Sequence, residues 1–293
     1  MGIGAALALA VVGTALALAL GGGGDDRDSA LGAVARIDRF DSGRAWAELE
    51  HQVELGPRPA GSRTLRGLAL RLRRELPAGT FERVPGHPRL RNVVGRLPGA
   101  KPAIVIAAHY DTKRLPGFVG ANDGAAGTAA VVELARALAE SERPSGAPEL
   151  RFVLFDGEEA TDDSRPFTET GLRGSTAYAS RHAGDVGALI LLDFIAAKRL
   201  TIQREGNSDR RLWSRLRAAA RAVGAGPAFP AGSGDTITDD HAPFVARGIP
   251  SIDLIQWPYQ CFHQRCDDLR AVSERSLDLT GEAVLELVRT LSR

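Results

Sequence analysis

Apolar and polar residues are segregated most clearly between residues 104 and 127. Residues 104–108 (IVIAA) form a continuous apolar run rich in β-branched side chains, and the triplet 109–111 (HYD) follows directly. A short apolar run that ends in polar residues is typical of a buried strand. After a loop, residues 120–124 (GANDG) lead into residues 125–140, whose apolar residues recur with helical spacing. The pattern predicts a strand that delivers side chains to its carboxyl end, followed by a loop and a helix.

The rest of the chain repeats this alternation of strands and helices. Further strands are predicted at residues 81–84, 92–96, 151–155, 187–194 and 249–255. Helices are predicted at 40–54, 63–76, 170–182, 208–223 and 273–291, together with a short one after 238–241 (TDDH), which would cap it. Ser62, at the end of a Pro- and Gly-rich loop, is a predicted N-cap, and Ser273 and Ser276 are the candidate caps of the last helix. The expected fold is α/β, a three-layer α/β/α sandwich around a mostly parallel sheet.

The first 24 residues differ from everything that follows. They carry no charged side chain, and Ile3–Leu20 is an Ala/Leu/Val run about as long as a signal-peptide core or a minimal membrane helix. The run is not amphipathic, which disfavours a buried core helix. We expect residues 1–24 to be a signal peptide or an N-terminal membrane anchor, 25–39 a linker and 40–293 one folded domain. The protein would then be exported, and either secreted, periplasmic or anchored to the outer face of the cytoplasmic membrane.

Composition and charge narrow the classes of partner. With 293 residues, 44% hydrophobic and 25% charged, the chain suits one sizeable globular domain. Its formal net charge of +1 gives no electrostatic reason to expect nucleic acid or an anionic membrane surface as a partner. We expect no nucleic-acid binding, membrane contact only through an N-terminal anchor, and a monomer.

Polar residues able to bind a metal close several of the predicted strands or open a helix. They are His109, Asp123, Glu158, Glu159, Asp193 and His263. In open α/β sheets, ligands gather at the carboxyl ends of the strands, so these residues fall where chemistry is expected. Zinc takes imidazole nitrogen and carboxylate oxygen, and a catalytic zinc site leaves one position open. Two metals about 3.5–4 Å apart can also share a bridging carboxylate.

Two neighbours refine this picture. Asp111 lies two residues after His109 on an extended segment and shares its face, so it would accept a hydrogen bond from the imidazole and fix its tautomer. Adjacent Glu158 and Glu159 cannot easily bind one ion in the same way. One would ligate the metal while the other, partly desolvated, would serve as a general base with a raised pKa.

Each of these residues also has a plain structural interpretation. A histidine at a strand end is commonly a hydrogen-bonded structural residue, DGEE is a common turn, and an aspartate at a helix start is commonly a cap. The coincidence of several ligand-type residues at strand ends favours a site. The residues alone leave a metal site and a set of structural polar groups about equally open.

Five segments together resemble the zinc aminopeptidase superfamily, which also contains the glutaminyl cyclases. They are HYD at 109–111, GANDGAAG at 120–127, DGEE at 156–159, LLDF at 191–194 and DDHAPF at 239–244. The resemblance runs from about Gly56 to Asp268. Within the superfamily, HYDTK, FVGANDGA and DDHAPFVARGIP are most similar to glutaminyl-peptide cyclotransferases. The resemblance implies a zinc-dependent exopeptidase-like fold with residues 40–293 as the catalytic domain.

The resemblance also implies roles for individual residues. Asp123, Glu159 and His263 would hold one catalytic zinc, and Glu158 would be the acid/base. His109 and Asp193 match the additional ligands of the two-zinc members, in which Asp123 would bridge the metals. In the cyclases, Asp193 instead acts as a hydrogen-bonding partner in catalysis, and Asp239 belongs to the same acidic network. The implied cofactor is one or two zinc ions.

The chain departs from the cyclase pattern at several positions. Cyclases carry a Trp shortly after DGEE and another just before the metal His, where this chain has Ser164 and Phe262. Trp257 lies close by and would compensate, which makes Phe262 and Trp257 the expected substrate-binding residues. A cyclase His is replaced by Asp253.

Two reactions therefore remain open. A cyclase would convert the N-terminal Gln of a peptide to pyroglutamate with release of ammonia. An aminopeptidase would use the same Glu158 to activate a water for hydrolysis of the first peptide bond. In both, peptide or protein N-termini are the partners. A third class, a non-catalytic ectodomain that binds without turnover, would not require a free carboxylate beside a metal.

The chain's two cysteines, Cys261 and Cys266, bracket His263. In an exported protein, a disulfide is favoured over two free thiols. So small a ring would stabilise the fold little through loop closure, but it would stiffen the loop that presents His263. The rival interpretation, a Cys-x-His-x-x-Cys zinc knuckle, lacks a nearby fourth ligand.

Overall fold

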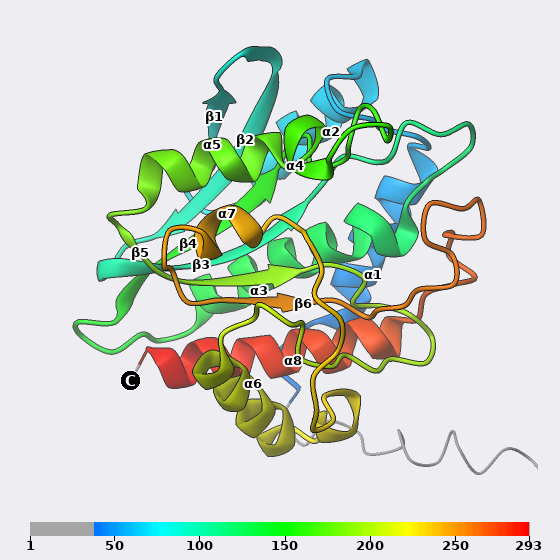
Figure 1. Cartoon of the computed structure of the whole chain (residues 1–293). Helices are drawn as coiled ribbons and strands as arrows, with labels where there is room; N and C mark the ends of the chain where they lie inside the picture. The colour runs from blue at the N-terminus through cyan, green and yellow to red at the C-terminus, as the bar shows by residue number, and fades with distance from the viewer. Residues whose placement is uncertain (1–37, 293) are drawn as a thin grey trace, which may run out of the picture. The chain divides into compact units, whose positions relative to one another are not determined.

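A mixed sheet forms the middle layer of the fold (Figure 1). The computed structural model describes residues 38–292, so the predicted signal peptide or anchor and nearly all of the predicted linker lie outside the described residues. The strands are β1 (Thr80–Val84), β2 (His87–Leu97), β3 (Ala100–His109), β4 (Pro148–Phe155), β5 (Val186–Leu192) and β6 (Ser251–Leu254). Their order across the sheet is β1-β2-β4-β3-β5-β6.

The half of the sheet that carries the candidate residues is parallel. β3 pairs parallel with β4 on one side and with β5 on the other, and β5 pairs parallel with β6. β2 runs antiparallel to both β1 and β4. The register places His109 opposite Phe155, and Leu192 opposite Leu254. The carboxyl ends of β3, β4, β5 and β6 therefore lie along one edge, as the sequence pattern predicts.

Helices cover both faces of this sheet, which confirms the predicted three-layer sandwich (Figure 1). They are α1 (Ser42–Glu54), α2 (Arg63–Glu75), α3 (Gly127–Glu140), α4 (Phe167–Thr170), α5 (Arg173–His182), α6 (Arg210–Ala222), α7 (Ala242–Val245) and α8 (Glu274–Leu291), with a π-helical turn, η2 (Ala121–Ala126), and a 3₁₀ turn, η3 (Gly226–Ala228). Across residues 38–292, no helix combines the length and the apolar character needed to cross a membrane.

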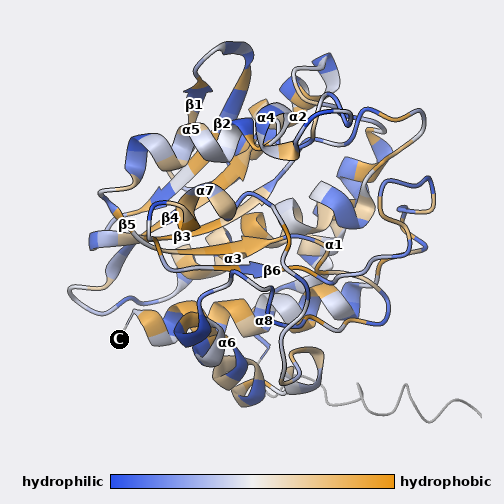
Figure 2. Ribbon diagram, viewed as in Figure 1, coloured by the Kyte–Doolittle hydropathy of each residue, from blue (hydrophilic) through white to orange (hydrophobic). Residues whose placement is uncertain are grey.

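Alternate side chains of the central strands enter two separate cores. In β3, Val105 and Ala107 pack in the smaller core with Tyr178 of α5 and Phe244 of α7. Ile104, Ile106 and Ala108 point the other way, into the larger core beneath α1, α3, α6 and α8. Both faces of the strand are buried, which explains its continuous apolar run. Figure 2 shows these central strands as the most hydrophobic part of the fold.

Of the predicted helix caps, Ser62 and Ser273 are confirmed, whereas Ser276 lies inside α8. Ser62 accepts a hydrogen bond from the backbone N–H of Leu65, and Ser273 accepts one from Ser276. The cap predicted at residues 238–241 is wrong, because α7, which lies within the described residues, has no side-chain cap. There the backbone carbonyl of Asp239 accepts the N–H of Ala242. This N–H group at the start of α7 is thus satisfied by a main-chain carbonyl, so the acidic side chains are not needed as caps.

Candidate active site

The carboxyl edge of the sheet brings together all six predicted strand-end residues. His109 is the last residue of β3, Glu158 and Glu159 follow β4, and Asp193 follows β5. The remaining two, Asp123 and His263, come from η2 and from the loop after β6. All of them are buried except His263, which is half-buried. Residues scattered over 155 positions of sequence therefore meet because parallel strands end at a common edge.

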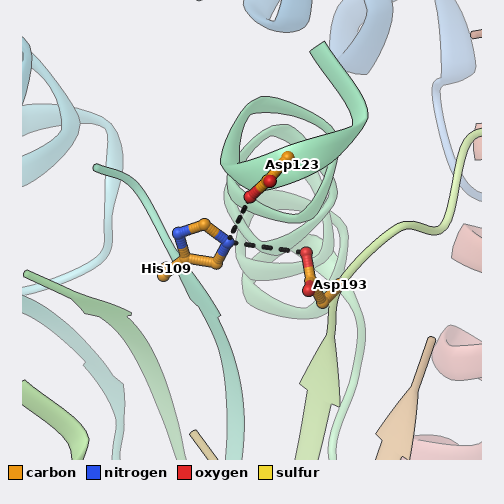
Figure 3. A group of neighbouring side chains, drawn as sticks. All are labelled: His109, Asp123 and Asp193. Carbon is orange, nitrogen blue, oxygen red and sulfur yellow. Dashed lines mark ion pairs between the residues drawn. The ribbon is translucent and has the colours of Figure 1, made fainter. Parts of the chain in front are cut away.

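One group of ligand-type atoms surrounds His109 (Figure 3). Its Nε2 lies 3.3 Å from Asp123 Oδ1 and 3.5 Å from Asp193 Oδ1. On the other side of the ring, Nδ1 lies 3.1 Å from the backbone carbonyl oxygen of Asp111. A hydrogen bond from Nδ1–H to that oxygen would leave Nε2 as the free lone pair facing the two carboxylates.

A second group shares the same aspartate. His263 Nε2 lies 3.6 Å from Asp123 Oδ2 and 3.3 Å from Glu159 Oε2. The two oxygens of the Asp123 carboxylate thus face different histidines, His109 and His263. This is the arrangement that a carboxylate shared between two neighbouring metal positions requires.

Gly124 makes this presentation of Asp123 possible. It adopts φ +97°, and a Cβ there would lie 2.8 Å from the Asp111 carbonyl oxygen and 3.2 Å from the His109 ring. Only glycine fits both the backbone conformation and the close approach. The helix predicted from residue 125 accordingly begins as α3 at Gly127, after a kinked turn that projects Asp123 toward the sheet edge.

Asp111 supports the site, although chiefly from a different direction than predicted. Its carboxylate is 3.8 Å from His109 Nδ1, farther away than its own carbonyl oxygen. The carboxylate instead accepts hydrogen bonds from the backbone N–H groups of Gly157, Glu158 and Glu159, at 3.0, 3.2 and 3.4 Å. It therefore anchors the DGEE turn to the end of β3.

Glu158, Asp193 and Asp239 all line one cavity of about 380 Å³, together with the ligand-type residues Asp123, Glu159 and His263. His109 is not part of the lining. All three members of the second group therefore line the cavity, whereas in the first group Asp123 and Asp193 line it and His109 does not.

Burial shifts the acidity of these carboxyl groups. It raises the pKa of Glu158 well above the ordinary value, against the opposing effect of His109, and nearby Glu159 and Asp239 raise it further. Burial raises the pKa of Asp193 to about 8, although its contact with His109 lowers it. Burial and Asp123 together raise the pKa of Glu159 to about 7. So many buried carboxyl groups favour either bound cations or shared protons.

The residues of the two groups fit a metal. Asp123 Oδ2 and Glu159 Oε1 are buried, and within the described residues neither has a hydrogen-bond partner. Buried polar atoms without partners are costly unless something outside the chain satisfies them. Imidazole nitrogen and carboxylate oxygen, buried together and facing a cavity, form a donor set that suits zinc.

A third cluster lies beneath Asp239. His241 Nε2 is 3.2 Å from Glu205 Oε2, and His241 Nδ1 is 3.4 Å from Asp253 Oδ2, with all three side chains buried. Burial would raise the pKa of Glu205. Hydrogen bonds from His241 and from two backbone N–H groups outweigh it and lower that pKa to about 2. The imidazole of His241 therefore lies between two buried carboxyl groups.

Aromatic side chains form the rim of the cavity. The expected residues Trp257 and Phe262 both line it, in an edge-to-face contact 4.9 Å between ring centroids, and Phe262 stacks on His263. Ser164 instead is exposed and hydrogen-bonds Asp162, whereas Phe167, three residues later, supplies an aromatic wall.

Sequence reasoning missed Lys113 and Phe167 as lining residues. Lys113 Nζ binds Asp163 at 2.5 Å and lies 3.9 Å from Glu159 Oε2. Its position in the HYDTK segment, two residues after Asp111, was the available signal.

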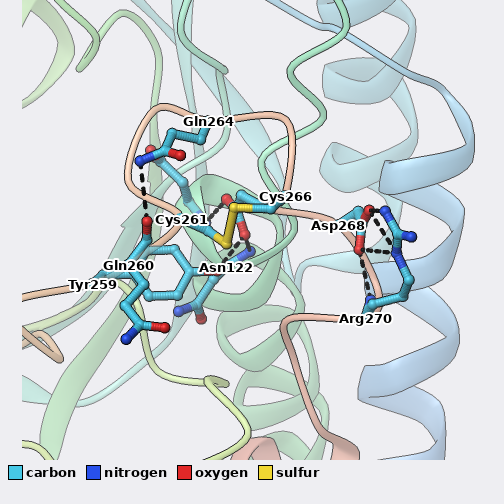
Figure 4. The surroundings of a disulfide bond; sticks show 10 residues. Asn122, Tyr259, Gln260, Cys261, Gln264, Cys266, Asp268 and Arg270 are labelled. Carbon is cyan, nitrogen blue, oxygen red and sulfur yellow. Dashed lines mark hydrogen bonds and ion pairs between the residues drawn. A yellow bond between two sulfur atoms is a disulfide. The ribbon is translucent and has the colours of Figure 1, made fainter.

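Cys261 and Cys266 form a disulfide, as predicted (Figure 4). Both sulfur atoms are occupied by this bond, so the alternative zinc knuckle is wrong. The six-residue ring that it closes contains His263.

The comparison with known proteins agrees with this geometry. The profile of Peptidase family M28 matches residues 92–288, about two thirds of the chain, and spans every ligand-type residue described above. The chain belongs to Peptidase family M28. This membership confirms the resemblance to the zinc aminopeptidase superfamily.

Individual relatives of this M28 chain carry two kinds of name. It is 32% identical over 235 residues to the glutaminyl-peptide cyclotransferase of Bos taurus, which covers 67% of this chain and 63% of that protein. It is similar to the crystal structure of an Acidobacteriales bacterium glutaminyl cyclase, with a TM-score of 0.76, 27% identity and coverage of 89% and 98%. A leucine aminopeptidase precursor from Bacteroides thetaiotaomicron also gives a TM-score of 0.76, with 26% identity and coverage of 87% and 99%.

Proposed function

We propose that this protein is a zinc-dependent enzyme similar to glutaminyl-peptide cyclotransferases, which converts the N-terminal Gln of peptides to pyroglutamate and releases ammonia. The observation that carries the proposal is the placement of Glu158 in the cavity beside the Asp123–Glu159–His263 group. The cyclase names of its relatives support the choice of reaction. The chain spans only about 63% of the length of the Bos taurus relative, so the activity is proposed on the site itself.

Asp123, Glu159 and His263 would hold the zinc, because these three side chains converge at the cavity wall. When bound there, zinc supplies Lewis acidity that polarises the γ-amide carbonyl of the substrate Gln. The other protein groups then handle protons and position the substrate.

Glu158 would take a proton from the substrate α-amine as that nitrogen bonds to the γ-amide carbon, and would deliver it to the amide nitrogen, whose bond to the same carbon breaks as ammonia leaves. Its buried carboxyl group has a raised pKa, which brings it closer to the range in which a group can both accept and return a proton near neutral pH. Asp193 and Asp239 line the same cavity and would hydrogen-bond the polar groups of the substrate during this transfer. Trp257 and Phe262 would cover the apolar stem of the Gln side chain and limit access of water.

We infer that a single zinc, in the cavity-facing group, is the working metal. The alternative, a zinc aminopeptidase with one or two zinc ions, has its own support in the chain. His109, Asp123 and Asp193 offer a second set of ligand atoms, and the Bacteroides neighbour is named as an aminopeptidase precursor. In that reaction, Glu158 would take the proton of the attacking water.

Mass spectrometry of a Gln-initiated peptide incubated with zinc-loaded protein separates the reactions. A product lighter by one ammonia supports the cyclase, provided that a zinc-loaded Glu158→Gln control gives only the slow spontaneous rate. Free Gln together with the shortened peptide would establish the aminopeptidase. An unchanged peptide, with other N-terminal residues also left intact, would refute both enzymes and favour a binding module.

Export is part of the same proposal. A disulfide such as Cys261–Cys266 is typical of proteins in oxidising compartments. We therefore expect the enzyme to be secreted, periplasmic or anchored at the outer face of the membrane.

A further inference from the structure

Asp267 is a buried acid that has no part in the mechanism above. It follows Cys266 directly and is 0% exposed. Its Oδ1 accepts hydrogen bonds from the backbone N–H of Asn122, at 2.9 Å, and from the hydroxyl of Tyr259, at 2.7 Å. Its Oδ2 accepts the backbone N–H of Asp123, at 3.1 Å. Both oxygens are therefore used, and two of the three donors belong to the segment that presents Asp123.

The same loop also carries His263. The ring closed by Cys261 and Cys266 contains this histidine, and Figure 4 shows the disulfide beside Asn122 and Tyr259. Within the loop, the N–H of Gln264 donates to the Cys261 carbonyl, and the N–H of Asp267 donates to the Gln264 carbonyl, both at 3.0 Å. His263 itself adopts φ +51°, a conformation unfavourable for a residue other than glycine. Such a backbone persists only where its surroundings hold it in place.

We propose that Asp267 is a positioning residue that joins the two sides of the metal site. Through the N–H groups of Asn122 and Asp123 it fixes the Asp123 carboxylate, and through the disulfide ring it is tied to His263. Zinc affinity at the cavity-facing group then depends on Asp267, although Asp267 touches neither zinc nor substrate. The inference rests on the zinc site proposed above and goes beyond it.

The carboxylate is chemically specific for this task. It offers acceptor oxygens on both arms, one for each backbone N–H. An Asn in its place keeps the shape but has one acceptor arm and one NH₂ donor, which would face a backbone N–H. Mutation of a residue that hydrogen-bonds and orients a metal ligand typically weakens metal binding by about 10- to 100-fold, and we expect an effect in this range here.

The neighbouring residue provides a matched control. Asp268 is adjacent in sequence, but its carboxylate pairs with Arg270, whose side chain is largely exposed (Figure 4). Asp268→Asn therefore makes the same chemical change one residue away from Asp267, at a side chain that does not hydrogen-bond the segment presenting Asp123.

The test is the zinc dissociation constant of the full chain, measured by competition with a chromophoric chelator. We expect Asp267→Asn to weaken zinc binding by about 10- to 100-fold and Asp268→Asn to leave it unchanged. We expect Tyr259→Phe to weaken it to a smaller degree, since one of three donors is lost. A Cys261→Ser/Cys266→Ser double variant should also weaken zinc binding, without adding a thiol that could itself bind the metal.

A merely structural role for Asp267 predicts a different pattern. The variant would then unfold at a lower temperature with and without zinc, while the folded protein kept the zinc affinity of the unchanged chain. That result would overturn the proposal. If Asp267→Asn does not fold, unchanged zinc affinity in both Tyr259→Phe and the double serine variant would overturn it. An unchanged chain that binds no zinc would refute the zinc site itself, which is a separate failure.

Discussion

The guanidinium of Arg58, which is wholly buried, donates a hydrogen bond to the carbonyl oxygen of Gly120 over 3.1 Å. It also donates to the carbonyls of Val119, at 2.6 Å, and Gln52, at 3.3 Å. Burial lowers the pKa of Arg58 to about 10, so the group remains protonated at neutral pH. One side chain from the Pro- and Gly-rich loop before α2 therefore holds the strand-to-helix connection that leads to Asp123.

Replacement of this arginine should destabilise the protein. We expect Arg58→Lys to lower the free energy of unfolding by about 2–3 kcal/mol, because a lysine cannot reach several carbonyls with a planar fork and loses charge more readily when buried. Urea denaturation measures the change. Arg74→Lys, at an exposed position on α2, is the control and should stay within about 0.5 kcal/mol. If Arg58→Lys changed the free energy of unfolding as little as Arg74→Lys does, the hydrogen bonds of the Arg58 guanidinium would contribute nothing to stability.

The two adjacent glutamates should respond differently to the same change. Glu158→Gln should reduce turnover by about 100- to 10,000-fold, as expected for loss of a general acid/base, with little change in zinc content. Glu159→Gln should lose zinc as well as turnover, because Glu159 faces His263 across 3.3 Å. Activity assays and metal analysis of dialysed protein test both statements. Full activity of Glu158→Gln would refute the assignment of the acid/base.

The two histidines should differ in their effect on zinc content. We expect the unchanged protein to hold one zinc per chain after dialysis, His263→Ala to hold almost none, and His109→Ala to keep about one with weaker affinity. The reason is that His263 lines the cavity with Asp123 and Glu159, whereas His109 is not among the residues that line it. Elemental analysis gives the ratios. Two zinc ions in the unchanged chain and one in His109→Ala would instead favour the two-zinc aminopeptidase.

Asp278 on α8 should give the protein a pH-dependent loss of stability. Burial, followed by repulsion from Glu282, Asp38 and Glu274, raises its pKa to about 6 from an ordinary value of 3.8. The folded state then binds this proton more tightly than the unfolded state, so the group favours folding at low pH and opposes it once the pH rises through about 6.

Asp278→Asn should remove that fall in stability between about pH 4 and 6. At pH 7 we expect a gain of about 1 kcal/mol, a modest value because solvent screens this half-buried group. Urea denaturation at several pH values measures it, and Asp235→Asn, at an exposed position, is the control. If the free energy of unfolding of Asp278→Asn varied with pH in the same way as that of the unchanged chain, the prediction would be contradicted.

The parallel half of the fold is predictable from sequence because its strands are buried on both faces. The apolar runs ending at His109 and Phe155 are recognisable without a structure, as are the caps Ser62 and Ser273. The antiparallel pairing of β2 with β4 is not, because it joins residues 93–97 to residues 150–154, which lie more than 50 positions later in the chain. Strand order depends on contacts between distant segments, which hydrophobic periodicity does not encode.

In the candidate site, too, some features can be predicted from the sequence and others cannot. Ligand-type residues such as His109, Asp123 and Glu159 stand out because they close strands or follow a glycine-rich turn. The role of the Asp111 carboxylate does not, because it accepts from backbone N–H groups some 46 residues later, which carry no residue-type signal. The hydrogen bonds that Asp267 accepts from the backbone N–H groups of Asn122 and Asp123 cannot be predicted from the sequence for the same reason. Main-chain donors are present at almost every position, so only coordinates show which of them a carboxylate binds.

The disulfide has a practical consequence for labelling. The chain contains only two cysteines, and both are joined in the ring around His263. A cysteine introduced at exposed Leu70 on α2 would therefore be the single thiol available to a maleimide dye. The fluorescence of such a conjugate would report on the protein in mixtures, or on its distance from a labelled peptide, with no native residue to remove first.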